Sequence, residues 1–201
     1  MKKCFTVVSA VFTVFLFVSC AGLPVERAGL PPERPLPPEY IMGKGMVSRE
    51  KMADFLILNN SGANRDFVIA LCGYYIEEAS AEGINHDTAF AQMCLETGFL
   101  RYGGLVTPDM NNFCGLGAIG PGQSGLSFPD PRTGVRAHIQ HLKAYASAEP
   151  LNQAMVDPRY RYVKLGSSPT IHGLSGTWAA DKLYSEKIGV ILERLYDFAF
   201  V

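Results

Sequence analysis

Apolar residues recur at helical spacing through the middle of the chain. The clearest run follows Asn64, and its apolar members are Phe67, Val68, Leu71, Cys72, Tyr75, Ile76 and Ala79. Spacings of three and four residues place such side chains on one face of a helix, and Gly83 is suited to end it. The pattern therefore predicts an amphipathic helix over about residues 64–82 that packs one face on a core.

The same spacing predicts four more helices, over about residues 48–58, 85–96, 133–147 and 184–195. Ser48 and Asn85 are suited to cap the first two of these. Between residues 98 and 131, glycine and proline are too frequent for a regular helix, so we expect a long ordered loop with at most one small hairpin. Residues 47–201 are therefore predicted to form a single mainly α domain of about five helices, α+β at most.

The amino-terminal residues have the pattern of a targeting signal. Lys2 and Lys3 precede an apolar run over residues 5–18. This run is shorter than the roughly 20 residues that a membrane-spanning helix needs. We therefore predict a signal peptide over residues 1–19 that is absent from the mature fold.

Cys20 ends the apolar run and changes the expected relation to the membrane. Residues 18–20 resemble a bacterial lipoprotein signal, in which the cysteine becomes the lipid-bearing first residue, although Phe17 stands where leucine is usual. The resemblance implies a lipid anchor at Cys20 and a place in the cell envelope, outside the cytoplasmic membrane. A plain secretory signal or a structural cysteine is the alternative. Residues 20–46 repeat a short proline motif, which predicts an extended tether or a disordered one of no set length.

Charge and cysteine content narrow the function classes. Removal of residues 1–19 takes away two of the 18 basic residues and none of the 19 acidic ones, which leaves a net charge of −3. No basic run is present to neutralise phosphates, so nucleic acid is not an expected partner. Cys72, Cys94 and Cys114 could form one disulfide outside the cytoplasm, but three buried thiols fit the sequence as well.

The strongest candidate for chemistry is Glu96. Apolar helical positions lead to it, and Gly98 follows, which places a carboxyl group at a helix end. A carboxyl group in an apolar setting stays protonated near neutral pH and can act as a general acid on a glycosidic oxygen. Taken alone, a glutamate near a helix end is more often a solvated surface residue.

Four stretches between residues 88 and 188 together resemble the glucosaminidase family of bacterial cell-wall hydrolases, which includes autolysins and flagellar muramidases. Residues 91–98 resemble its catalytic helix end, residues 111–117 its substrate loop, residues 134–142 the helix behind the cleft, and residues 178–188 its closing motif. The resemblance implies a lysozyme-like domain with a small hairpin lobe over the cleft. It also implies an endo-β-N-acetylglucosaminidase that cuts the β-1,4 bond after N-acetylglucosamine in peptidoglycan, with Glu96 as the acid.

Four further residues are candidates for substrate contact. The family's closing motif commonly opens with a tyrosine implicated in catalysis, whereas this chain has Trp178, and Tyr184 at the motif's second tyrosine keeps a hydroxyl. Trp178 is expected either to stack on a sugar ring or to lie in the core. Asn112 is expected to hydrogen-bond an acetamido group and Phe113 to line a sugar subsite, with packing inside the loop as the alternative.

The second catalytic group is left open by the sequence. Glycoside hydrolysis ordinarily uses two carboxyl groups, and the candidates are Asp109, just before the loop, and Asp130, beside Pro131. Both also suit turns or helix caps. In a third route the substrate's own 2-acetamido group attacks the anomeric carbon.

The remaining expectations concern metals, partners and rival functions. His138 and His141 lie three residues apart on a predicted helix, but no third ligand has a useful spacing, so we expect no metal and no cofactor. We expect a monomer. The rival interpretations are a lytic transglycosylase acting after N-acetylmuramic acid, which also uses one glutamate at a helix end, and a non-catalytic wall-binding lipoprotein, prompted by Trp178.

Mass spectrometry of the mature amino terminus tests the predicted anchor. We expect the first residue to be Cys20, with its mass increased by covalently attached lipid. An unmodified terminus that begins at another residue would contradict the lipoprotein interpretation.

Overall fold

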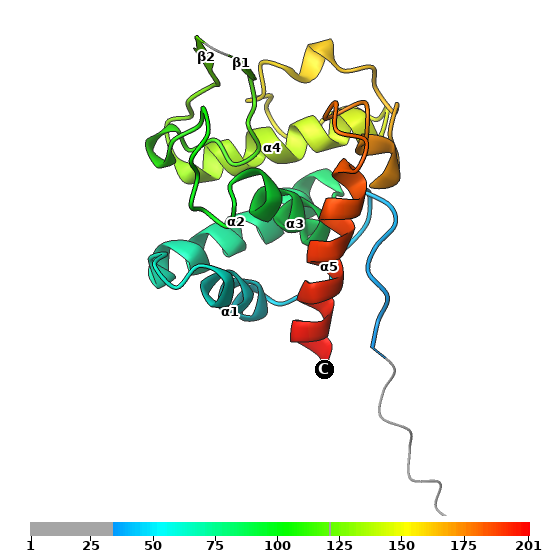
Figure 1. Ribbon diagram of the computed structural model, residues 1–201. Coiled ribbons are helices and arrows are strands. Elements are labelled where there is room, and N and C mark those ends of the chain that lie inside the picture. Colours follow the sequence, from blue (N-terminus) through cyan, green and yellow to red (C-terminus); the bar gives the residue numbers. More distant parts are fainter. Residues whose placement is uncertain (1–33, 121) are drawn as a thin grey trace, which may run out of the picture. The chain divides into compact units, whose positions relative to one another are not determined.

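The computed structural model describes residues 34–120 and 122–201 (Figure 1). The predicted signal peptide and Cys20 lie outside these residues. The elements, in order, are α1 (Arg49–Asn59), α2 (Arg65–Glu82), α3 (His86–Glu96), η1 (Pro108–Met110), β1 (Ala118–Gly120), β2 (Gln123–Ser124), α4 (Pro131–Ala146), η2 (Tyr160–Tyr162), η3 (His172–Leu174) and α5 (Tyr184–Phe200). The predicted mainly α fold with five α-helices is confirmed. Within the described ranges, every helix is too short or too polar to serve as a membrane span.

Polar side chains at the predicted positions begin the helices. Ser48 accepts a hydrogen bond from the Lys51 amide, and Asn64 and Asn85 cap α2 and α3 in the same way. These caps satisfy backbone N–H groups that have no partner inside the helix. Gly83 ends α2 with φ 76°, a left-handed conformation that glycine adopts without strain.

Helix α3 is the most enclosed element of the domain. Every residue from His86 to Cys94 is buried, and the helix packs against α2, α4 and α5, as Figure 1 shows. A helix buried on all sides is mostly apolar, and its buried polar side chains are costly unless they find partners. Leu95 and Glu96, at its carboxyl end, are not buried, so the helix leaves the core there.

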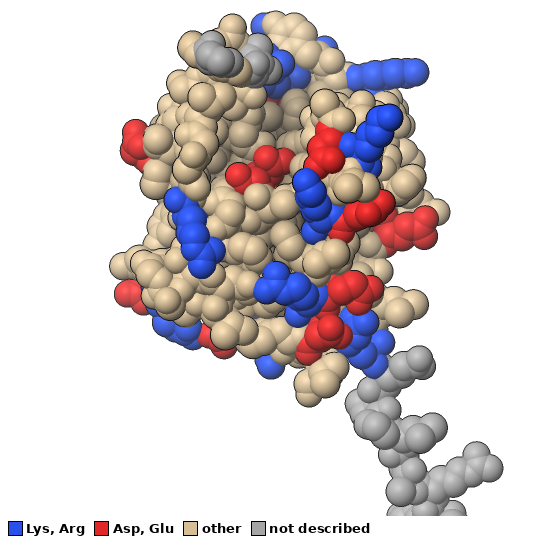
Figure 2. Space-filling view, viewed as in Figure 1, with Lys and Arg blue, Asp and Glu red and all other residues tan. Residues whose placement is uncertain are grey.

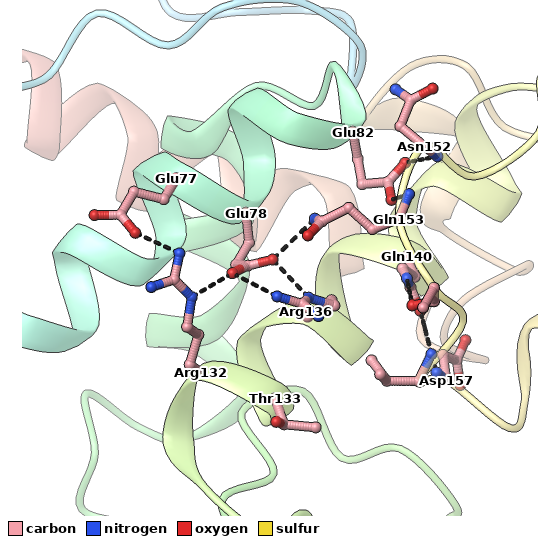
Figure 3. Close-up of polar contacts among 12 residues, drawn as sticks. Glu77, Glu78, Glu82, Arg132, Thr133, Arg136, Gln140, Asn152, Gln153 and Asp157 are labelled. Atoms are coloured by element: carbon pink, nitrogen blue, oxygen red, sulfur yellow. Dashed lines mark hydrogen bonds and ion pairs between the residues drawn. The ribbon is translucent and has the colours of Figure 1, made fainter.

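A buried charge network joins α2 to α4 and to the segment after α4 (Figure 3). Arg132 and Arg136 donate to Glu78 at 2.6 and 2.8 Å. Buried Lys143 donates to Glu82 at 2.8 Å. Burial alone would raise the pKa of Glu78, but the hydrogen bonds from the two arginines bring it down to about 2. Because both carboxylates are paired with cations of α4, α4 is fixed in register against α2.

Residues 34–46, which the proline content assigns to the tether, instead belong to the helical domain, which begins at Arg34. Ile41 is fully buried, its amide donates to the Pro169 carbonyl at 3.0 Å, and its carbonyl accepts from the Asn85 amide at 2.8 Å. Arg34 pairs with Glu193 of α5 at 2.8 Å. Proline removes amide donors but does not prevent the residues between prolines from pairing, and this explains the misplaced boundary.

The long loop contains the small hairpin that the sequence predicts. Strands β1 and β2 pair antiparallel, with Ala118 opposite Ser124. The thiols of Cys72, Cys94 and Cys114 are free and buried. The alternative of three buried thiols is therefore the one that the structure supports.

Ile41→Ala tests whether the segment before α1 is part of the fold. Loss of a buried isoleucine side chain should cost about 2–5 kcal/mol of unfolding free energy. Each ~1 kcal/mol lowers Tm by roughly 2–4 °C in a domain of this size, so thermal unfolding followed by circular dichroism would detect the change.

Leu36→Ala is the matched control, since Leu36 is 82% exposed and such a surface change should stay within about 0.5 kcal/mol. Equal Tm values for the two variants would mean that residues 34–46 do act as a tether.

Candidate active site

Glu96 is the last residue of α3, where the chain turns sharply away from the helix. Thr97 holds this turn, because its hydroxyl donates to the Met93 carbonyl at 2.8 Å and accepts from the Leu100 amide at 2.9 Å. Phe99 and Leu100 follow with φ values of 58° and 61°. A left-handed conformation costs a residue other than glycine about 1–2 kcal/mol, so the turn is strained and is held by its contacts.

A cavity of about 230 Å³, here called the acid cavity, opens beside Glu96. Its walls come from the loop after α3, including Tyr102 and Val106, and from the loop that carries Gly115 and Ala118. Figure 2 shows this face of the domain hollowed between the lobe of β1 and β2 and the loops before α5. Glu96 is therefore a carboxyl group that a ligand can reach.

A second hollow of about 170 Å³ adjoins the acid cavity at Gly115 and Ala118. We call it the aromatic hollow; its lining residues are Cys114, Gly115, Leu116, Gly117, Ala118, His141, Tyr145, Arg159 and Trp178. The Trp178 ring lies 5.0 Å from His141 and 5.5 Å from Tyr145 between centroids. The two hollows share Gly115 and Ala118 in their walls and together form one groove.

Two donors meet one oxygen of the Glu96 carboxyl group. The Tyr184 hydroxyl donates a short hydrogen bond to Oε1, and the Trp178 indole N–H donates to the same atom at 3.2 Å. Surrounding protein atoms desolvate the carboxyl group and raise its pKa, and the two donors partly counteract this rise. The raised pKa keeps Glu96 protonated to a higher pH than an ordinary glutamate.

Tyr184 is itself held by a buried chain of hydrogen bonds. Gln92 donates to the Tyr184 hydroxyl at 2.8 Å, His138 Nε2 contacts the Gln92 Oε1 atom at 2.9 Å, and Tyr75 contacts His138 Nδ1 at 2.9 Å. Burial lowers the pKa of His138 to about 3, so the ring is neutral. With its proton on Nε2, His138 donates to Gln92 and accepts from Tyr75. Each hydrogen bond in this series, from Tyr75 through His138 and Gln92 to Tyr184, is then donated in the direction of Glu96.

The structure departs from the expectation for the loop residues Asn112 and Phe113. The Asn112 amide nitrogen donates to the carbonyls of Leu116 and Leu126, both at 2.9 Å, and its oxygen accepts from the amides of Cys114 and Leu116. These four hydrogen bonds leave Asn112 none for an acetamido group. Phe113 is 1% exposed and lies in the core, so its ring lines no subsite.

The two aspartates considered as partners of Glu96 lie elsewhere. Asp109 is exposed on η1 and lines neither hollow. Asp130 caps α4 through the Thr133 amide at 2.9 Å, and this bond holds its pKa below the usual value. Among the described residues, Glu96 is the one carboxylate that lines either hollow.

The histidines of α4 have structural partners. His138 belongs to the chain that ends at Glu96, and His141 contacts the buried Asp157 carboxylate at 2.7 Å. No group of three metal-binding side chains occurs in the described part of the chain. Sequence reasoning missed Gln92 and Tyr75; the available signal for Gln92 was a polar residue inside an otherwise apolar helix.

A family model, a known protein and a solved structure each resemble this chain. A family model named Glucosaminidase and described as mannosyl-glycoprotein endo-beta-N-acetylglucosaminidase matches residues 72–197. An uncharacterized protein of Borreliella burgdorferi is 41% identical over 159 residues, which cover 79% of this chain and 78% of the relative. A crystal structure of S. aureus autolysin E with the muropeptide NAM-L-Ala-D-iGlu is similar at 12% identity and a TM-score of 0.49, over 79% of this chain and 71% of that one.

Tyr184→Phe tests how the hydrogen bonds act on Glu96. The variant removes a donor that stabilises the ionised carboxylate, so the pKa of Glu96 should rise further above the usual value. A ¹³C NMR titration of labelled glutamate side chains, with Glu96→Gln to assign the resonance, measures it.

Tyr102→Phe is the control, because Tyr102 lines the same cavity and no hydrogen bond between it and Glu96 is present among the described contacts. A Glu96 pKa that falls, or stays the same, in Tyr184→Phe would contradict the assigned role of the donor.

Proposed function

The chain belongs to the glucosaminidase family, and from this premise we propose that it is a peptidoglycan hydrolase that cuts the β-1,4 bond after N-acetylglucosamine. The observation that carries the proposal is the Glu96 carboxyl group, which lines the acid cavity with a raised pKa and two hydrogen-bond donors on one oxygen. A protonated carboxyl group in such a position is what general acid catalysis on a glycosidic oxygen requires.

The two oxygens of Glu96 have different roles in the proposed reaction. Tyr184 and Trp178 both donate to Oε1, so the proton to be transferred sits on Oε2. Gly115 leaves space beside that atom, since a Cβ there would lie 3.8 Å from it. Oε2 gives its proton to the glycosidic oxygen as the bond to the anomeric carbon breaks. The two donors then stabilise the charge left on the carboxylate.

The proposed second group is the 2-acetamido group of the substrate. Its carbonyl oxygen attacks the anomeric carbon as the leaving oxygen takes the proton, and water then opens the cyclic intermediate with net retention. Support comes from the positions of Asp109, exposed on η1, and Asp130, engaged as a helix cap. Product analysis by NMR tests this route, since net inversion of the anomer would exclude it.

The donor at Trp178 argues against a decayed, non-catalytic site. The residue replaces the tyrosine that is common in the family, yet its indole N–H still donates to Glu96. We propose further that the enzyme acts in the cell envelope, on a lipid anchor at Cys20.

Glu96→Gln should remove most activity on purified peptidoglycan. Loss of a general acid costs about 10²–10⁴-fold in rate, and liquid chromatography with mass spectrometry measures the products. Wild-type digests should contain fragments with N-acetylglucosamine at the reducing end.

Two matched variants sharpen the assay. Asp109→Asn should keep near wild-type activity if the acetamido group assists, and so should Glu186→Gln, which changes an exposed glutamate on α5. Undiminished activity of Glu96→Gln would show that Glu96 is not the acid. Anhydro-muramyl ends in the digest would contradict the hydrolase proposal and indicate a lytic transglycosylase.

A further inference from the structure

The two hollows on either side of Gly115 differ in charge. Among its described lining residues, the acid cavity has no lysine or arginine, and its walls near Leu105 and Val106 are apolar. The aromatic hollow is lined by Arg159 together with Tyr145 and Trp178. A groove with a neutral end and a cationic end favours one register of a ligand whose neutral and charged units alternate.

We propose that Arg159 binds a carboxylate of the substrate and thereby places the carboxylate-bearing N-acetylmuramic acid unit in the aromatic hollow. The neutral N-acetylglucosamine unit then lies in the acid cavity, and the bond between them lies at Glu96. This inference rests on the proposed function and adds a specificity-determining residue to it. Peptidoglycan alternates two β-1,4 bonds, so for a given strand direction the register of the strand decides which one is cut.

The Arg159 guanidinium is available to an anion. Within residues 34–120 and 122–201, no carboxylate oxygen lies within 4 Å of it, whereas Arg132 and Arg136 both pair with Glu78. The nearby Asp157 carboxylate is engaged otherwise, since it contacts His141 at 2.7 Å and accepts from the Arg159 backbone amide at 2.8 Å. A cation without a carboxylate partner beside an open hollow gains most from a ligand anion.

The backbone that carries Arg159 is held in place before any ligand arrives. Gln140 of α4 accepts from the amides of Val156 and Asp157 at 2.8 and 3.2 Å, and donates to the Ala154 carbonyl at 2.9 Å (Figure 3). The guanidinium itself lies over the Tyr162 ring, 5.4 Å from its centroid. A preorganised group loses little conformational entropy on binding, so more of the interaction free energy contributes to affinity.

Arg159→Gln removes the charge and keeps much of the side-chain length. We expect KM for carboxylate-bearing glycan to rise about tenfold, the loss expected for one charge-assisted hydrogen bond, with kcat little changed. Hydrolysis of neutral N-acetylglucosamine oligomers should be unaffected. Arg161→Gln is the matched control, because Arg161 lies over the same Tyr162 ring at 5.1 Å but does not line the hollow.

Two anionic substrates identify the source of the carboxylate. Stem-bearing peptidoglycan presents peptide carboxylates, whereas amidase-stripped glycan presents the lactyl carboxylate. A raised KM on either one supports the inference and assigns the group. An equal effect on neutral oligomers, or no effect on both anionic substrates, would overturn it.

Binding measurements separate this inference from the proposed function. Calorimetry with a soluble disaccharide-peptide compares Glu96→Gln with the double variant Glu96→Gln/Arg159→Gln, and the second should bind about tenfold more weakly. If wild-type protein cuts no glycan but this difference is present, the proposed hydrolase function fails and the anion site stands. If glycan hydrolysis depends on Glu96 but the two variants bind the disaccharide-peptide equally, only the proposed anion site at Arg159 is rejected and the proposed function stands. Unfolding curves check that each variant is folded.

Discussion

The buried polar side chains of α3 fix the arrangement of the elements around it. Asp87 accepts from the amides of Met46 and Val47 and from the Tyr196 hydroxyl, which ties both the segment before α1 and the end of α5 to the start of α3. Gln92 bonds Tyr184 at the start of α5. Because a buried polar group without a partner costs about 1–3 kcal/mol, these two residues determine the antiparallel register of α5 against α3. That register brings Tyr184 to Glu96.

The charge network between α2 and α4 serves the other wall of the groove. Glu82 accepts from the amides of Asn152 and Gln153, and Glu78 accepts from the Gln153 side chain. Buried ion pairs contribute little net stability, since desolvation of the charges offsets their attraction, but removal of one partner is costly. Their effect here is geometric: they hold the segment that leads from α4 to Arg159. Glu96 and Arg159 are thus positioned by separate sets of buried polar contacts.

The sequence predicts those features that depend on neighbours along the chain. Helical periodicity and the cap residues Ser48, Asn64 and Asn85 are local, and all three cap their helices. A carboxyl group at the end of α3 follows from the same reasoning. The boundary at residue 47 is wrong because one apolar residue, Ile41, outweighs the surrounding prolines once it is buried.

The details of the site depend on contacts that no local pattern contains. Gln92 and Tyr184 are 92 residues apart, and Tyr75 and His138 are 63 apart. The motif around Asn112 resembles a loop of the family but does not tell where its side chains point. In this structure the Asn112 side-chain amide hydrogen-bonds to backbone groups of its own loop. Only the three-dimensional packing decides between a ligand contact and a loop contact for such a residue.

Trp178 connects the two halves of the groove. Its indole N–H reaches Glu96, while its ring packs on His141 and Tyr145 in the aromatic hollow. A tyrosine at this position could donate or accept a hydrogen bond, whereas an indole N–H only donates. Trp178 can therefore stabilise the ionised carboxylate of Glu96 but cannot accept a proton from a reacting group. At this position Trp178 contributes a fixed dipole and an apolar wall.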